Sequence, residues 1–308
     1  MRLGSDLRTT LPNDEGSRGF PGGALKLVVL HRDICIGFAG TVPIGLEAIR
    51  SAAAVIPADG IDDRSAIELP LVRASVRANV DLLVAWLRPT ALLKISQGRV
   101  ERDLASAWVG DAEAFAAFQE VFVEGKVSLP PTGWEGGVEQ YREMRRQSRA
   151  QMREQRATFM TPGELDDFDI RERSTDAMRE VVEATHIDSV GEAAITVSGT
   201  DEDEGFHYLP RVEMHRGGLR SDHPSGVTPI EIGSAEMGDY AVIVSVPDTA
   251  GVPAVGIYFV EPRLGYLFLP LRQDIPVVYR NLPASEFHDA VKDDHGITLT
   301  GIGITSAG

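Results

Sequence analysis

Ser221, Asp222 and His223 are consecutive and supply the three residue types of a Ser-His-Asp hydrolase triad, in which the histidine takes the proton of the serine hydroxyl. Triad residues meet in space and are seldom neighbours in the chain. The run also lies within a Gly/Pro-rich stretch at 216–237, which is typical of a loop. We therefore interpret it as a surface turn.

The other polar residue types do not indicate a metal or phosphate site. The seven histidines form no His-x-x-x-His pair, and Cys35 is the single cysteine, so it has no cysteine partner. The acidic run at 201–204 lacks the glycine and the later glutamate of an EF-hand loop. Gly16, Gly19 and Gly22 follow no long strand and open no helix, unlike a phosphate-binding loop. We expect no cofactor and no bound metal ion.

The first forty residues hold a more specific arrangement. Asp6 ends a short strand in the run Gly4-Ser5-Asp6-Leu7-Arg8-Thr9-Thr10. After a Pro/Gly-rich loop, Lys26 lies in the first of two predicted strands, at 25–30 and 33–39, and Gly40 ends the second. The apolar runs are continuous rather than alternating, which indicates a sheet covered on both faces.

This succession resembles the start of a proteasome-type N-terminal-nucleophile hydrolase. The run at 4–10 is similar to the Ala-Asp-Ser-Arg-x-Thr strand end of proteasome β-type subunits. The spacing from Lys26 to Gly40 matches the family spacing between an active-site lysine and the glycine of the substrate-binding segment. Trp108-Val109-Gly110-Asp111 resembles the Ser/Gly-rich strand end before the third helix, with Asp111 where the family often has serine.

The resemblance implies an α+β fold, the αββα four-layer sandwich, over about residues 3–215. It also implies amide or peptide hydrolysis by an N-terminal Thr, Ser or Cys whose own α-amine acts as the base. Lys26 would lower the pKa of that amine, Asp6 would orient the lysine, and the Gly40 N–H would stabilise the oxyanion. Asp188 and Ser189 lie where the family has residues that support the amine.

The family nucleophile precedes the Asp by more residues than this sequence has before Asp6. Two hypotheses follow: a hydrolase whose nucleophile lies upstream of Met1, or a non-catalytic, proteasome-like interaction or scaffold protein. Thr9-Thr10 follows the strand end and leads into a loop, so we do not expect it to replace the nucleophile. For Asp6 and Lys26 the alternative is an ordinary ion pair, and for Asp188 it is a helix-end cap.

Further along, helices and strands are predicted from apolar spacing. Leu46 and Ile49 indicate a helix after Gly40, and a polar loop follows at 57–69. Val72, Val76 and Val80 begin a helical spacing that continues to Leu87 and would stop at Pro89. We expect strands at 91–95, 104–109, 193–197 and 206–214, a helix capped by Gly110-Asp111, and a helix at 174–184.

Two regions differ from the proteasome pattern. Residues 124–173 are rich in charge and poor in apolar residues, which predicts a solvated insertion or protruding helix, with a partner-binding arm as an alternative. Residues 216–308 have no counterpart and read as a β-rich extension with strands at 240–246, 254–260, 265–271 and 277–279. We therefore divide the chain into an N-terminal-nucleophile domain at 1–215 and an extension at 216–308.

The composition excludes several classes of protein. The net charge of −16 argues against general binding to nucleic acid or to an anionic membrane. No apolar stretch approaches the roughly 20 residues of a membrane span, and no signal peptide is evident, so a cytoplasmic location is the default. The resemblance implies self-assembly into a homo-oligomer, or binding to a partner protein.

Overall fold

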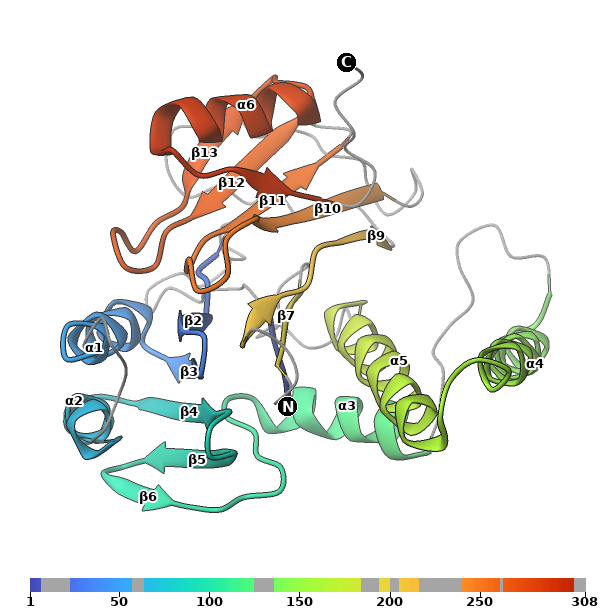
Figure 1. The fold of residues 1–308 in the computed structure, drawn as a ribbon, viewed down its shortest axis with the longest axis horizontal. Helices are drawn as coiled ribbons and strands as arrows, with labels where there is room; N and C mark the ends of the chain where they lie inside the picture. Colours follow the sequence, from blue (N-terminus) through green and yellow to red (C-terminus); the bar gives the residue numbers. More distant parts are fainter. Residues whose placement is uncertain are drawn as a thin grey trace.

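The computed structural model describes residues 1–6, 23–56, 64–124, 136–183, 194–199, 205–215, 240–260 and 263–301. These residues form an α+β fold, as predicted, in which the strands are arranged in three antiparallel sheets (Figure 1). The loops predicted around 13–22, 201–204 and 216–237 lie outside the described residues.

The central sheet is a five-stranded meander in which sequence neighbours pair. Its strands, in spatial order, are β2 (Leu27–His31), β3 (Ile34–Gly40), β4 (Val80–Trp86), β5 (Ala91–Ser96) and β6 (Arg99–Glu101). Helices α1 (Val42–Ala53) and α2 (Arg64–Arg77) lie between β3 and β4 in sequence and cover one face of this sheet. The other face is buried as well, which confirms the inference from the continuous apolar runs.

The helix predicted over 72–87 is wrong, because the segment divides between α2 and β4. Val76 is 68% exposed near the end of α2, whereas Val80 and Val84 are buried in β4. A central strand with both faces covered is apolar throughout, so its residues also satisfy a helical period.

Three other boundaries differ from the prediction. Helix α2 begins at Arg64, inside the loop predicted at 57–69, and residues 104–109 form no strand. The aromatic Trp108 of that segment instead stacks on the α3 helix. Helix α5 begins at Pro162 rather than at Ser174. Its first half has few apolar residues and was therefore not predicted to be helical, but acidic residues are favourable near a helix N-terminus.

A second sheet has the order β1 (Arg2–Asp6), β7 (Ala194–Ser198) and β8 (His207–Tyr208). Helix α5 (Pro162–Glu183) packs on β1 and β7, and α3 (Ala112–Glu124) packs on α5. A Cβ atom at Gly4 would lie 3.2 Å from the Met178 side chain, so the glycine allows close approach of the helix. The Arg2 guanidinium also donates to the Ser174 hydroxyl of α5, at 3.1 Å.

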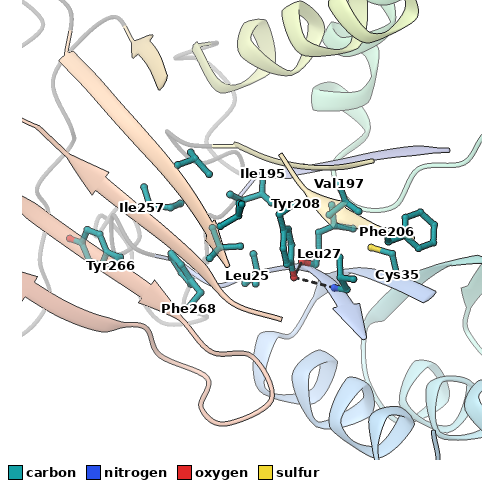
Figure 2. Close-up of a cluster of buried hydrophobic side chains, with 14 of the residues drawn as sticks. Leu25, Leu27, Cys35, Ile195, Val197, Phe206, Tyr208, Ile257, Tyr266 and Phe268 are labelled. Carbon is teal, nitrogen blue, oxygen red and sulfur yellow. Dashed lines mark hydrogen bonds between the residues drawn. The ribbon is translucent and has the colours of Figure 1, made fainter. Parts of the chain in front are cut away.

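The Tyr208 hydroxyl joins the second sheet to the central one. It accepts a hydrogen bond from the Val29 N–H at 3.1 Å and donates to the Leu27 carbonyl at 3.2 Å (Figure 2). Tyr208 is 4% exposed, and burial raises the pKa of its hydroxyl, so the group stays protonated and can serve as donor and acceptor at once.

The C-terminal sheet has the order β13 (Val277–Arg280), β12 (Leu264–Phe268), β11 (Val255–Phe259), β10 (Tyr240–Pro247) and β14 (Leu299–Thr300), with β9 (Arg211–His215) also paired to β10. Helix α6 (Ala284–His295) covers its outer face. The Phe287 ring lies directly over Gly265, where a Cβ atom would be 2.4 Å from the ring. Two glycines on neighbouring strands, Gly256 and Gly265, thus make room for one aromatic side chain.

The inner face of the C-terminal sheet shares one apolar cluster with β2, β7 and β8. Figure 2 shows Ile257, Tyr266 and Phe268 from this sheet opposite Leu25 and Tyr208. At the rim, the Arg50 guanidinium of α1 donates to the Pro270 carbonyl at 2.9 Å and to Asp274 at 2.7 Å. The C-terminal region therefore packs against the rest of the protein through both apolar and ionic contacts.

Strand β9 falls within the range 1–215 but pairs with β10 of the C-terminal sheet. A boundary near residue 210 would keep this sheet whole. None of the described helices is long and apolar enough to cross a membrane.

We predict that Tyr208→Phe destabilises the protein by about 1–3 kcal/mol, because two buried backbone groups of β2 lose their partner. Urea titration of both proteins gives the difference in their free energy of unfolding. Tyr258→Phe is the matched control, since the Tyr258 hydroxyl satisfies a single acceptor, the Leu282 carbonyl at 2.6 Å. Equal losses in the two variants would contradict a special role for Tyr208 between the sheets.

Candidate functional site

The β3–α1 junction is built around Gly40. Its φ is +105°, and a Cβ atom there would lie 1.9 Å from the Asn79 carbonyl oxygen, so only glycine fits. The Thr41 N–H donates to the same carbonyl at 3.3 Å. Pro43 in the first turn then helps α1 to begin, because its fixed φ suits a helix start. The backbone at the end of β3 is thereby held against the start of β4.

Gly110 lies against the end of β3. Its φ is +104°, and a Cβ atom there would be 3.2 Å from the Cβ of Ala39. Asp111 caps α3, as predicted: its carboxylate accepts from the Glu113 N–H at 2.8 Å and the Ala114 N–H at 3.0 Å. The segment identified by its Gly-Asp pair therefore lies beside the end of β3, although about seventy residues separate them in sequence.

Lys26 lies across from the end of β3. Its carbonyl accepts from the Phe38 N–H at 2.9 Å, which extends the β2–β3 ladder by one residue. Amide groups two residues apart in a strand point to the same side, so the Gly40 N–H is directed toward the β2 side. Leu25 and Leu27 are buried, whereas Lys26 is half-buried, consistent with its side chain lying on the opposite face. Lys26, Gly40 and Gly110 thus all lie at the end of β3, with Lys26 on the face of the sheet that α1 and α2 cover and Gly110 against Ala39, and we call these three residues the glycine corner.

A cationic and aromatic group borders the glycine corner. The Trp108 ring stacks on Phe115 with ring centres 4.6 Å apart, and the Lys94 ammonium lies 5.4 Å from the centre of the Trp108 ring. On β4, Asp81 is opposite Ala39 and accepts a hydrogen bond from the Ser96 hydroxyl at 2.6 Å.

The remaining predicted site residues are not brought together by the described structure. The backbone of Asp6 pairs with Ala194 in the β1–β7 ladder, but its side chain lies outside the described residues. Asp188 and Ser189 also lie outside them, as does the Ser221-Asp222-His223 run. The roles assigned to these residues stay predictions.

Cys35 lies in the shared apolar cluster and is fully buried. Burial raises the pKa of its thiol far above the ordinary value, so the thiolate is not available as a nucleophile. Within the described ranges, no group of three or more His, Cys, Asp or Glu side chains is arranged to hold a metal ion.

Sequence reasoning missed the pair formed by Ser245 of β10 and His288 of α6. The Ser245 hydroxyl lies 2.8 Å from His288 Nε2, and the two residues are 43 positions apart. Ser245 is 0% exposed, so a substrate cannot reach the hydroxyl. The pair therefore holds α6 on the C-terminal sheet. No motif around Ser245 or His288 in the sequence indicated that these two side chains are in contact.

No protein-family model matches this chain, and no curated protein matches its sequence. Among solved structures, the chain is similar to the eukaryotic HslV of Trypanosoma brucei, with 16% sequence identity and a TM-score of 0.35. The match covers 63% of this chain and 90% of the HslV chain. At these values the likeness establishes neither a shared function nor a shared fold.

We predict that Gly40→Ala destabilises the protein by at least about 2 kcal/mol, because the new Cβ would clash with the Asn79 carbonyl and a positive φ would be imposed on alanine. Thermal unfolding measures the effect. Gly163→Ala is the control: no atom lies within 4 Å of its Cβ position, and it lies in the first turn of α5. That substitution should leave stability unchanged or raise it by about 0.5–1 kcal/mol. A tolerated Gly40→Ala would contradict the geometry of the corner.

His288 should make stability depend on pH. Burial is the main cause that lowers the pKa of His288 below its ordinary value of 6.5, and Asp289 opposes the shift. The folded protein therefore binds a proton at His288 less readily than the unfolded chain does. The contribution of neutral His288 to the free energy of unfolding is thus present above about pH 6.5 and is lost as the pH falls. We expect His288→Gln, which retains an amide near Ser245, to lose stability less steeply between pH 7.5 and 5.5 (roughly one unit to each side of that pKa). Urea titrations at several pH values measure the free energy of unfolding of both proteins. An equal change with pH in the two would contradict the role of His288.

Proposed function

We propose that this chain is a proteasome-like N-terminal-nucleophile protein that hydrolyses amide or peptide bonds, with its nucleophile on a strand preceding Met1. The observation that carries this proposal is the glycine corner, where the residue before β2, the end of β3 and the segment before α3 lie close together. These are three of the segments on which the sequence resemblance rests. Their meeting was not implied by their positions in the chain.

The order of the layers supports an αββα sandwich. From left to right, Figure 1 has α1, the strands β2 and β3, the strand β7, and α5. Helices α1 and α2 cover the outer face of the central sheet, and α5 packs on β1 and β7. The Tyr208 hydroxyl and the shared apolar cluster join the two sheets between them.

We place the proposed nucleophile strand beside β1. Among the described strands, β1 pairs with β7 alone. A strand that precedes β1 and pairs with its other edge in an antiparallel hairpin would begin beside Asp6, at the far end of β1 from Met1. Its first residue would then be a Thr, Ser or Cys whose α-amine is the base.

In this mechanism the glycine corner supplies positive electrostatic potential. The Lys26 ammonium lowers the pKa of the α-amine and so favours its neutral, basic form. The amine takes the hydroxyl or thiol proton as the nucleophile attacks the scissile carbonyl. The Gly40 N–H donates to the oxyanion that forms, and Asp6 orients the lysine. Asp188 and Ser189 would hold the amine.

A non-catalytic interaction protein is the second candidate, and one observation favours it. Helix α4 (Val138–Arg156) lies apart from the sheets at the side of the molecule and contributes no buried residue to the described core (Figure 1). A helix presented in this way is suited to partner binding rather than to catalysis.

The first experiment is N-terminal sequencing and intact-mass analysis of the protein purified from its native source. An N-terminus at a Thr, Ser or Cys upstream of Met1 supports the hydrolase, and the protein should then cleave fluorogenic peptide amides. A protein that begins at Met1 would contradict the hydrolase proposal and favour the interaction protein.

For the processed protein, we predict that Lys26→Ala lowers turnover of a peptide amide by at least about a hundredfold, because general-base catalysis typically contributes that much. Lys292→Ala is the control, since Lys292 lies in the last turn of α6 and away from the glycine corner. The pH profile distinguishes the role: loss of Lys26 should raise the pKa of the α-amine and so move the acidic limb of the profile toward higher pH. An unchanged profile would contradict the role of Lys26 in tuning the amine.

A further inference from the structure

Helices α4 and α5 carry opposite charges. Helix α4 has six arginines and three glutamates, a net charge of +3 in a chain whose total is −16. Helix α5 has eight acidic and three basic residues, a net charge of −5. The five residues from 157 to 161 connect them, so the two helices form a hairpin of complementary charge.

The contacts between the two helices are mainly ionic. The Arg145 guanidinium donates to Asp176 at 3.0 Å, and Arg153 donates to Asp166 at 3.2 Å and also to Asp169. The Arg156 guanidinium lies 3.7 Å from the centre of the Phe168 ring. Three arginines of one face of α4 therefore contact α5, two of them through carboxylates and one through an aromatic ring.

Apolar burial adds little to this contact. No side chain of α4 is among the buried hydrophobic residues of the described chain, whereas α5 contributes Leu165, Ala177 and Val181, and α3 packs on α5. Since the hydrophobic effect scales with buried apolar area, α4 is held more weakly than α3. The pairs of Arg153 are partly exposed, and such pairs contribute only about 0.2–1 kcal/mol each and are screened by salt. Asp176 is buried, so its pair with Arg145 is the least screened of these contacts.

Helix α5 does not need α4 for its own N-terminus. The Thr161 N–H donates to the Glu164 carboxylate at 2.7 Å, and the Glu164 N–H donates to the Thr161 hydroxyl at 3.4 Å. This capping box satisfies the first turn within α5 itself. Helix α4 can therefore leave while α5 remains folded.

We propose that α4 is a detachable arm whose arginine face binds an acidic helical segment of a partner protein, with α5 as its resident occupant. The carboxylates that it now binds are at 166, 169 and 176, a spacing of i, i+3 and i+10 that places them on one helix face. A partner with acidic residues at this spacing would present the same surface. Phe159, which is exposed in the turn that follows α4, offers such a partner an apolar contact.

Carboxylates rather than phosphates are the favoured partner groups. The groups that pair with Arg145 and Arg153 are carboxylates, and Arg142 and Arg146 pair with the carboxylates of Glu139 and Glu143 on the same helix. The chain as a whole is strongly acidic, which disfavours approach of a polyanion such as nucleic acid. The proposal is independent of the hydrolase proposal.

The test uses a fluorescent synthetic peptide of residues 162–183 as the acidic helix and the full chain as the receptor. Asp166→Asn with Asp169→Asn in the receptor weakens the resident contact. We expect this variant to bind the peptide about tenfold more tightly than the unsubstituted chain, as expected for losing two ion pairs of the hairpin. A peptide with asparagine at the three acidic positions should not bind.

Arginine substitutions identify the binding face. Arg145→Gln with Arg153→Gln, added to the weakened receptor, should abolish binding of the peptide. The matched control is Arg99→Gln with Arg272→Gln, which removes two exposed arginines from other parts of the protein. Hydrogen exchange of β3 and β4 should be unchanged in every variant, which reports that the sheets remain folded.

Several outcomes would overturn the proposal. One is the absence of binding by the weakened receptor, and another is equal binding of the asparagine peptide. Concentration-dependent dimers of the weakened receptor would show that a second copy of this chain is the occupant. Tighter binding of an oligonucleotide of equal charge would show that the arm recognises phosphates.

Discussion

The Tyr208 hydroxyl is the interaction on which the arrangement of the sheets depends. It satisfies the Val29 N–H and the Leu27 carbonyl at the edge strand of the central sheet, where no further strand is described to do so. Because the group is buried, both backbone partners would otherwise be unsatisfied at considerable cost. The same contact sets where β2 begins relative to β7 and β8. Lys26 lies one residue before β2, so its position relative to the second sheet follows from a contact made by a distant tyrosine.

The C-terminal sheet completes the core around this contact. Its inner face supplies apolar side chains to the cluster that contains Leu25, Leu27 and Tyr208. Its outer face is closed by α6, whose Phe287 ring occupies the space left by Gly256 and Gly265. Removing this region would leave the apolar residues at the edge of β2 exposed. The region predicted as an extension is therefore energetically part of the same protein core, although its division into domains stays a prediction.

Sequence reasoning succeeded where the determinants are local. The β2–β3 hairpin, the α1 helix after Gly40 and the Asp111 cap depend on hydrogen bonds between residues that are close in the chain. It failed for β4, because burial on both faces removes the alternation that distinguishes a strand from a helix. It could not find the Tyr208 and Ser245 contacts, which join residues 179 and 43 positions apart. For the candidate site, the resemblance implied that Lys26 and Gly40 lie near each other, whereas the contact of Gly110 with Ala39 was not predicted.

The composition of the glycine corner limits the chemistry that it can perform. At Gly40 and Gly110 a side chain is excluded by a positive φ and by the close approach of Asn79 or Ala39. What these positions offer is backbone N–H groups, and Lys26 adds an ammonium. All of these groups stabilise negative charge, and none of them takes a proton from a nucleophile at neutral pH. In the proposed hydrolase the base and the nucleophile would therefore come from another segment, and the strand proposed beside β1 would bring both in a single N-terminal residue.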